Sequence, residues 1–338
     1  MKQIRFRAVR PGRAATALAG ALGATLAVAA CGGSGSTAAD SNGVTTITVG
    51  IPAAVTADAV QIAQDNGYFR QHHLKVDIKT LNGGAGTVPA LQSGAIQVAQ
   101  SNVLSEIQGA AHGLAVPCFA GAFDLTDPGT GNVGLIPLVA GARSGITKPS
   151  DLAGKTIALN ATGGVNQLMM DAWLKQQGVD FHSVHYIAME FPDMPQAITA
   201  GRVDAAVMVE PFGTQVVHQG ARLISGYLEG NIQGHPIFSC WNGSADWLKK
   251  NAAAARNFIA AITQANDFIN NQPDQFRTWL QKNSQIPAAV IKDIALPRFT
   301  TDMSNADVTG WEKAAQAYGI VTGPSVDTAD VYAPISGS

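Results

Sequence analysis

The chain has 338 residues, of which 46% are hydrophobic and 14% charged, and its formal net charge is −2. This length and apolar content allow one large or two smaller globular domains. The lack of a basic excess argues against a nucleic-acid-binding protein, so we expect no nucleic acid among its partners. The 36 glycines show no repeat period, which excludes a fibrous chain.

The first thirty residues predict a lipoprotein signal peptide. Five basic and no acidic residues accompany an apolar, alanine-rich run over 14–30 that is short for a membrane span. The run ends at Cys31, before a Gly/Ser-rich stretch, and this arrangement resembles the bacterial lipobox. We expect cleavage after residue 30, a membrane anchor on acylated (palmitate-bearing) Cys31, and a flexible tether over 31–43. Ordinary secretory cleavage is the alternative.

Cleavage changes the charge of the protein. Removing 1–30 leaves 17 Lys+Arg against 24 Asp+Glu, a net charge of −7 over 308 residues. The sequence therefore predicts an acidic body tethered to the extracytoplasmic face of the cell membrane.

Residues 45–100 predict a strand–helix–strand–helix–strand unit, from alternating apolar residues in the strands and glycines that end the helices. Thr56 is the expected N-cap of the first helix, and the glycine-rich segment 83–87 is expected to open the second. We expect strands at 45–51, 74–78 and 96–100 and helices at 56–66 and 88–92.

The same order of elements recurs about 110 residues later. Asp193 is the expected cap of a short helix that ends at Gly201. We expect strands at 155–159, 185–189 and 203–209 and a long helix at 165–177. The repeat predicts an α/β fold with two lobes, each a doubly wound, mainly parallel sheet. Coincidence between two ordinary βαβ runs is the alternative.

The remaining segments suggest how the chain moves between the lobes. We assign 44–143 plus 236–338 to lobe 1, with a strand at 236–241, a helical block over 244–318 and a loose polar tail from 322. Residues 144–235 form lobe 2. In an exported protein, Cys118 and Cys240 could form a disulfide, with two buried free thiols as the alternative.

The loops after the strands predict a ligand site. Ligands bind open α/β sheets at the carboxyl ends of the strands, so two facing lobes should share a cleft. Phe191, Phe212 and Trp241 could stack on a ligand or simply pack in the core. Glu190, Asp193 and Glu210 lie near the expected cleft and would repel an anion if they pointed inward. The candidate ligand-binding residues are Thr56, Gly84, Thr87, Ser101, Asn102, Thr162, Gly163, Asn166, Asp193 and Glu210.

Four segments of the chain have a distinctive sequence: Gly67-Tyr68-Phe69 with Leu74 to Asp77, Ala90 to Val98, Asp151-Leu152-Ala153-Gly154-Lys155, and Gly201 to Pro211. They resemble the binding proteins for nitrate, taurine, alkanesulfonates and thiamine-pyrimidine precursors, the NMT1/THI5-like and SsuA-like family. The resemblance implies a type II periplasmic-binding-protein fold with a C-terminal helical block. It also implies a protein that captures a small molecule by hinge closure and delivers it to an ABC permease and its ATPase. We expect a monomer without a cofactor. The implied ligand is sulfonate- or taurine-like, or pyrimidine- or thiamine-precursor-like.

The sequence contains no motif of nucleophilic, P-loop or zinc-peptidase chemistry, so we do not expect an enzyme. His182 and His185 would face opposite sides of a strand, and we expect no metal site. The alternatives are an enzyme of pyrimidine biosynthesis on the same scaffold and a ligand sensor for a membrane receptor.

Overall fold

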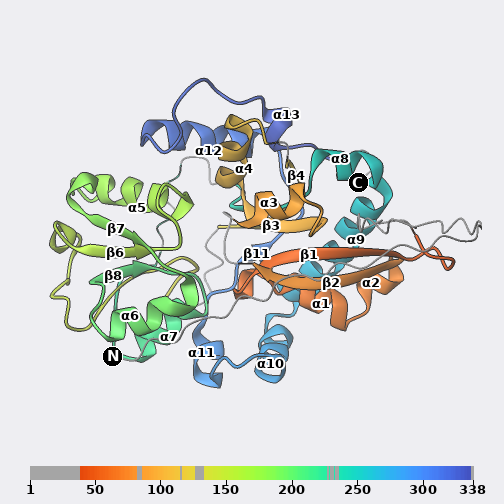
Figure 1. The fold of residues 1–338 in the computed structure, drawn as a ribbon. Coiled ribbons are helices and arrows are strands. Elements are labelled where there is room, and N and C mark those ends of the chain that lie inside the picture. The colour runs from red at the N-terminus through yellow and green to blue at the C-terminus, as the bar shows by residue number, and fades with distance from the viewer. Residues whose placement is uncertain are drawn as a thin grey trace, which may run out of the picture. The chain divides into compact units, whose positions relative to one another are not determined.

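The computed structural model describes residues 39–81, 86–114, 116–125, 133–226, 228, 232 and 236–335, all within one compact unit, Gly35–Ser338. Its strands form two separate sheets, each flanked by helices (Figure 1). This arrangement confirms the predicted two-lobed α/β fold.

The first sheet has six strands in the order β11-β4-β10-β3-β1-β2. β1 is parallel to β2 and β3, whereas β10 is antiparallel to β3 and β4. β1 forms as expected because its apolar residues alternate with threonines, and Ile47, Val49 and Ile51 are buried. The strands are β1 (Thr45–Pro52), β2 (Leu74–Leu81), β3 (Val98–Asn102), β4 (Cys118–Asp124), β10 (Ser239–Asn242) and β11 (Arg298–Phe299).

The second sheet has five strands in the order β7-β6-β8-β5-β9. β6 is parallel to β7 and β8, and β5 is antiparallel to β8 and β9. The strands are β5 (Leu138–Ala140), β6 (Thr156–Leu159), β7 (His185–Ala188), β8 (Ala205–Val207) and β9 (Arg222–Ser225).

The two sheets share one topology. The order β2-β1-β3-β10-β4 of the first matches β7-β6-β8-β5-β9 of the second, with a single antiparallel strand, β10 or β5, in the same place. The predicted internal repeat is therefore confirmed. Each sheet is mainly parallel as expected, apart from β10 and the edge strand β11 in the first and β5 in the second. One detail was wrong: the boundary at 143/144 lies too late. β5 pairs with β8 and β9, so the second sheet already includes residues 138–140.

Helices cover both faces of each sheet (Figure 1). In the first lobe α3 (Thr87–Gln92) and α4 (Val103–Ala111) lie on one face, and α1 (Ala59–Asp65) and α2 (Tyr68–Gln71) lie on the other with α9 (Ala252–Asn271). In the second lobe α5 (Val165–Gln176) covers one face, and α6 (Met194–Thr199) and α7 (Phe212–His218) cover the other. Short 3₁₀ turns lie at η1 (Val55–Ala57), η3 (Pro149–Leu152), η4 (Phe181–Ser183) and η5 (Phe191–Asp193).

The chain after β10 builds the predicted helical block onto the first lobe. The apolar residues of α9 recur every three or four positions, and Phe258 stacks on Phe69 at 5.7 Å and meets Trp241 edge-on at 5.0 Å. β11 interrupts the block by pairing with β4. Its helices besides α9 are α8 (Ala245–Lys250), α10 (Pro273–Asn283), α11 (Ala288–Asp293), α12 (Asn305–Ala317) and α13 (Thr328–Val331).

Cys118 and Cys240 lie on the adjacent strands β4 and β10, and their sulfur atoms are joined in a disulfide. Both side chains are fully buried. The bond links the strand by which the chain leaves the first sheet to the strand by which it returns.

Three local predictions were wrong. Thr56 does not cap a helix, because residues 55–57 form a separate 3₁₀ turn and α1 starts at Ala59. Asp193 occupies an N-cap position but its side chain makes no capping hydrogen bond. The tail is held in place through residue 335: α13 packs on α4, and Tyr332 bridges to Cys118 and donates from its hydroxyl to the Met303 carbonyl at 2.8 Å.

Candidate functional site

A cavity of about 80 Å³ lies at the carboxyl ends of strands from both sheets, where the topology predicts a ligand cleft. The ends of β1, β2, β3 and β4 meet the turn after β6, the start of α5 and the residues after β8. The first lobe contributes Pro52, Ala54, Thr56, Leu81, Thr87, Gln100, Ser101, Asn102, Phe123, Phe238 and Ser239, and the second contributes Ile136, Asn160, Val165, Asn166, Phe191 and Val209.

The first-lobe wall is held by hydrogen bonds between neighbouring strand ends. Gln100 on β3 donates from Nε2 to the Thr56 carbonyl at 2.9 Å, which fixes the turn after β1. Asn102 accepts the Ser105 N–H at 2.9 Å and caps α4. Ser239 on β10 donates from its hydroxyl to the Ser101 carbonyl at 2.7 Å. These contacts present a row of amide and hydroxyl groups at one edge of the sheet.

The second-lobe wall is built around the start of α5. Asn166 donates to the Asn160 side-chain oxygen at 2.9 Å, and both residues line the cavity. The preceding turn is fixed through Gln167, whose Oε1 accepts the Gly163 N–H at 2.8 Å and whose Nε2 donates to Asp171. The N–H groups of the first turn of α5 face outward from a helix N-terminus, which favours an acceptor atom of a ligand.

The lobes also touch each other beside the cavity. Gln108 of α4 donates from Nε2 to the Gly163 carbonyl at 2.8 Å, so Gly163, a predicted ligand-binding residue, makes a contact between the lobes. On the other side, the Val55 N–H lies 3.4 Å from the Glu210 carbonyl. Both contacts would have to adjust if the lobes moved apart.

Buried carboxyl groups lie behind the walls. Burial raises the pKa of Glu106 to about 7, while hydrogen bonds from Ser101 and Asn242 oppose this rise. Burial likewise raises the pKa of Glu210 to about 7, against hydrogen bonds from Thr214. Glu210 Oε1 accepts the Thr214 hydroxyl at 2.6 Å, at the start of α7. These groups shape the protein near the cavity without lining it.

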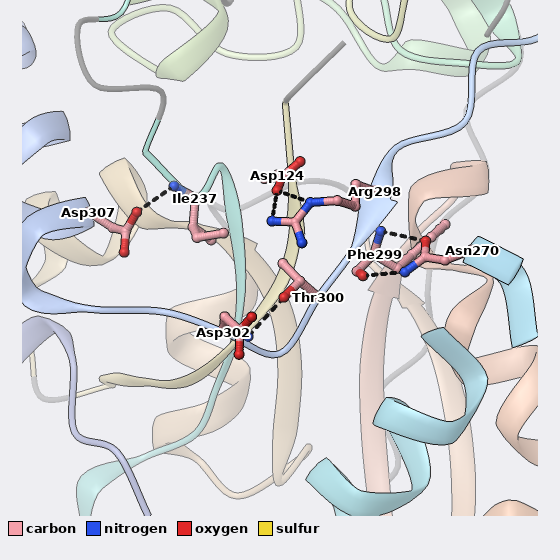
Figure 2. Close-up of polar contacts among 8 residues, drawn as sticks. All are labelled: Asp124, Ile237, Asn270, Arg298, Phe299, Thr300, Asp302 and Asp307. Carbon is pink, nitrogen blue, oxygen red and sulfur yellow. Dashed lines mark hydrogen bonds and ion pairs between the residues drawn. The ribbon is translucent and has the colours of Figure 1, made fainter. Parts of the chain in front are cut away.

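Aromatic rings close the cavity. Phe123 at the end of β4 and Phe238 just before β10 lie with ring centroids 5.5 Å apart, and Phe191 lines the cavity from the second lobe. The residue next to each of the first two rings is held by a polar contact (Figure 2). Asp124, after Phe123, is paired with Arg298, and Ile237, before Phe238, donates its N–H to Asp307 at 2.8 Å.

Hydrogen bonds within the C-terminal helical block hold β11 and the residues that follow it. Asn270 of α9 accepts the Phe299 N–H at 3.1 Å and donates to the Phe299 carbonyl at 2.7 Å, while Asp302 donates its N–H to the Thr300 hydroxyl at 3.0 Å (Figure 2). These contacts hold the stretch of chain that directly follows Arg298.

The predicted site residues divide into three groups. The first lines the cavity: Thr56, Thr87, Ser101, Asn102 and Asn166. The second lies elsewhere: Thr162 and Asp193 are exposed, Gly163 contacts Gln108, and Glu210 is fully buried. The third, Gly84 and Cys31, lies outside the described residues.

The expected stacking residues also divide. Phe191 lines the cavity, but Trp241 is buried in the first-lobe core against Phe258, and Phe212 packs against the core of the second lobe. The expected repulsion of an anion by acidic side chains does not arise from Glu190 or Asp193, since both are exposed and neither lines the cavity.

Sequence reasoning missed Gln100, Asn160, Phe123 and Phe238. Asn160 follows directly on a predicted strand, so the strand-end rule could have found it. Gln100 is the last residue of the strand expected at 96–100, but β3 runs over Val98–Asn102 and Gln100 lies in its middle, so the strand-end rule did not select it. The two phenylalanines come from β4 and from the approach to β10, whose neighbourhood depends on long-range pairing.

Every residue that lines the cavity in the described part of the chain is uncharged. Among the same described residues, no cluster of His, Cys, Asp and Glu could hold a metal ion. No described helix combines the length and the apolar character needed to cross a membrane.

Solved structures with this fold include solute-binding proteins. The alkanesulfonate-binding protein SsuA from Xanthomonas axonopodis pv. citri, bound to MOPS, superposes with a TM-score of 0.73 at 16% identity, over 85% of this chain and 98% of that chain. The nitrate-binding protein NrtA from Synechocystis PCC 6803 superposes with a TM-score of 0.69 at 16% identity, over 86% of each chain. The fold is therefore that of a two-lobed periplasmic binding protein.

The sequence defines the family more narrowly. The NMT1/THI5 like family model matches residues 58–276, and the chain belongs to this family. The taurine-binding periplasmic protein of Escherichia coli (strain K12) is 25% identical over 233 residues, which are 68% of each chain. A Brachyspira hyodysenteriae ABC transporter periplasmic binding protein is 29% identical over 136 residues, which span 38% of its length and 39% of this chain. The resemblance predicted from the sequence is confirmed.

Proposed function

We propose that the protein is the extracytoplasmic solute-binding component of an ABC importer. The observation that carries this proposal is the cavity whose wall is drawn from the strand ends of both lobes. A ligand there touches Asn102 and Asn166 from opposite sides and gains contacts only when the lobes are together. Such a ligand stabilises the closed arrangement by its differential affinity for it.

The proposed ligand is a small organic molecule, either sulfonate- or taurine-like or pyrimidine- or thiamine-precursor-like. Family membership and the relative that binds taurine support the first class. The phenylalanines and side-chain amides of the cavity support the second, since they can stack on and hydrogen-bond to a flat heterocycle.

The proposed partners are an ABC permease with its ATPase, and the membrane itself through acylated Cys31, with the protein acting as a monomer. The lipobox-like sequence before Cys31 supports the anchor. Metabolic labelling with a palmitate analogue tests this part: we expect label on the wild type and none on Cys31→Ser, which should be released from cells. Label on both proteins would contradict the proposal.

Binding is tested by thermal unfolding in the presence of taurine, alkanesulfonates, nitrate and aminopyrimidines. A ligand at 100-fold its Kd should raise the free energy of unfolding by about 2.7 kcal/mol. Asn166→Ala should weaken this effect, because it removes an amide from the second-lobe wall. Asn283→Ala is the matched control, since Asn283 lies exposed on α10 away from the cavity. Turnover of a pyrimidine substrate would instead favour the enzyme alternative.

A further inference from the structure

The charge of the cavity wall restricts what it can hold. All of its lining residues are uncharged among the residues that the structure describes, and the internal segments outside that description contain no Lys or Arg in their sequence. Arg298, on the strand that pairs with β4 beside the aromatic wall, is paired with Asp124. An anion in this cavity would therefore lose its water and meet no full opposite charge, with only amides, hydroxyls and the N-terminus of α5 to replace its hydration.

Gln100 supplies a specific polar signal. Its Nε2 donates to the Thr56 carbonyl, and because a carbonyl oxygen can only accept, this bond fixes which end of the amide is which. The other end, Oε1, is buried and has no hydrogen-bond partner, while the residue is 5% exposed and lines the cavity. A buried acceptor of this kind calls for a donor.

The aromatic side of the cavity is held firmly. Phe123 and Phe238 each adjoin an anchored residue, Asp124 in its pair with Arg298 and Ile237 in its hydrogen bond to Asp307 (Figure 2). Because the backbone is fixed next to each ring, the pair forms a preorganised apolar surface rather than a loose contact. Such a surface suits the flat face of a ring.

We propose that the ligand of this cavity is an uncharged molecule with an aromatic or similarly flat body, whose N–H or O–H group donates to Gln100 Oε1. The inference rests on the proposed solute-binding function and narrows its ligand class. It disfavours a sulfonate anion, whose oxygens would meet a fixed acceptor and find no cationic side chain.

Two matched pairs of probes test the proposal: benzenesulfonamide against benzenesulfonate, and methanesulfonamide against methanesulfonate. Within each pair the shape is nearly constant, while the sulfonamide carries no charge and adds N–H donors. Titration calorimetry on the full mature chain should give a Kd at least tenfold lower for benzenesulfonamide than for benzenesulfonate. Benzenesulfonamide should also bind more tightly than methanesulfonamide.

A substitution localises the effect. Gln100→Leu should reduce the preference for benzenesulfonamide over benzenesulfonate to less than threefold. Gln97→Leu is the matched control and should keep the preference, because Gln97 is also buried but uses both ends of its amide on the backbone, at Thr48 and Gly94. If Gln100→Leu does not fold, the comparison of probe pairs on the wild type decides alone.

The outcomes separate the inference from the proposed function. Equal or tighter binding of the sulfonates overturns the inference and leaves solute binding intact. An unchanged preference in Gln100→Leu overturns the assignment of the donor to Gln100. Absence of binding by all four probes overturns the inference, and the proposed function then fails only if the wider panel of taurine, nitrate and aminopyrimidines is also silent.

Discussion

Replacing Glu106 with glutamine is expected to stabilise the protein at pH 8 and to change little at pH 4. Glu106 is 1% exposed, and its Oε1 accepts the Asn242 amide at 2.8 Å. Burial raises its pKa from 4.5 to about 7. The folded state therefore binds more protons than the unfolded state between these two values, and stability falls as the pH rises through that window.

The magnitude follows from the two pKa values. Ionising a group with a pKa of about 7 in the folded state and 4.5 in the unfolded state costs about 3 kcal/mol of stability at pH 8, whereas at pH 4 the group is mostly protonated in both states and the cost nearly vanishes. A glutamine at position 106 keeps the oxygen that accepts from Asn242 and never ionises. Glu106→Gln should remove most of this loss.

Urea unfolding followed by tryptophan fluorescence at both pH values measures the difference in the free energy of unfolding. Glu190→Gln removes one negative charge from an exposed position of the second lobe and controls for net charge. A gain of less than 1 kcal/mol at pH 8, or an equal gain at pH 4, would refute the reasoning, because the cost of the buried charge would then be absent.

Two further predictions concern covalent and steric constraints on the chain. Replacing Cys118 and Cys240 together by alanine should lower the free energy of unfolding by up to about 5 kcal/mol, because the disulfide closes a loop of 122 residues. Urea unfolding with and without reductant measures this loss, and an unchanged unfolding midpoint would contradict it. Gly134→Ala should destabilise the protein by about 2 kcal/mol or more, because Gly134 has φ +89° and a Cβ there would collide with the Gly226 carbonyl. Gly145 has a similar φ, +76°, but no atom lies near the position of a Cβ, so Gly145→Ala should cost only about 1 kcal/mol. Thermal unfolding of both variants measures the difference, and equal losses would contradict the predicted collision at Gly134.

Local patterns predicted the elements well where each lies within one repeat. The alternation over 45–51 and the glycine stop at Gly94, which has φ +72°, are properties of a few neighbouring residues. The strand-end rule then located Ser101, Asn102 and Asn166 at the cavity without any knowledge of side-chain packing. Short-range physics sufficed for these.

The domain boundary and the position of the Glu210 side chain depend on contacts that local sequence patterns do not reveal. β5 belongs to the second sheet because it pairs with β8 and β9, which lie more than 60 residues later in the chain. Composition near β5 does not reveal this pairing, so the domain boundary could not be predicted from it. Glu210 looked like a cleft residue because it follows β8, yet its side chain turns to Thr214 and becomes fully buried. Register and side-chain direction carry this information, and neither has a local signature.

The placement of β10 has a consequence for the order of assembly. The second sheet is complete once residues 138–225 have been synthesised, whereas the first needs β10 between β3 and β4 and then β11 at its edge. The first lobe therefore begins earlier in the chain but is completed later than the second. Until β10 has been synthesised, the place between β3 and β4 in its sheet is unfilled. During biogenesis, β3 and β4 are the exposed sheet edges most in need of protection from other chains.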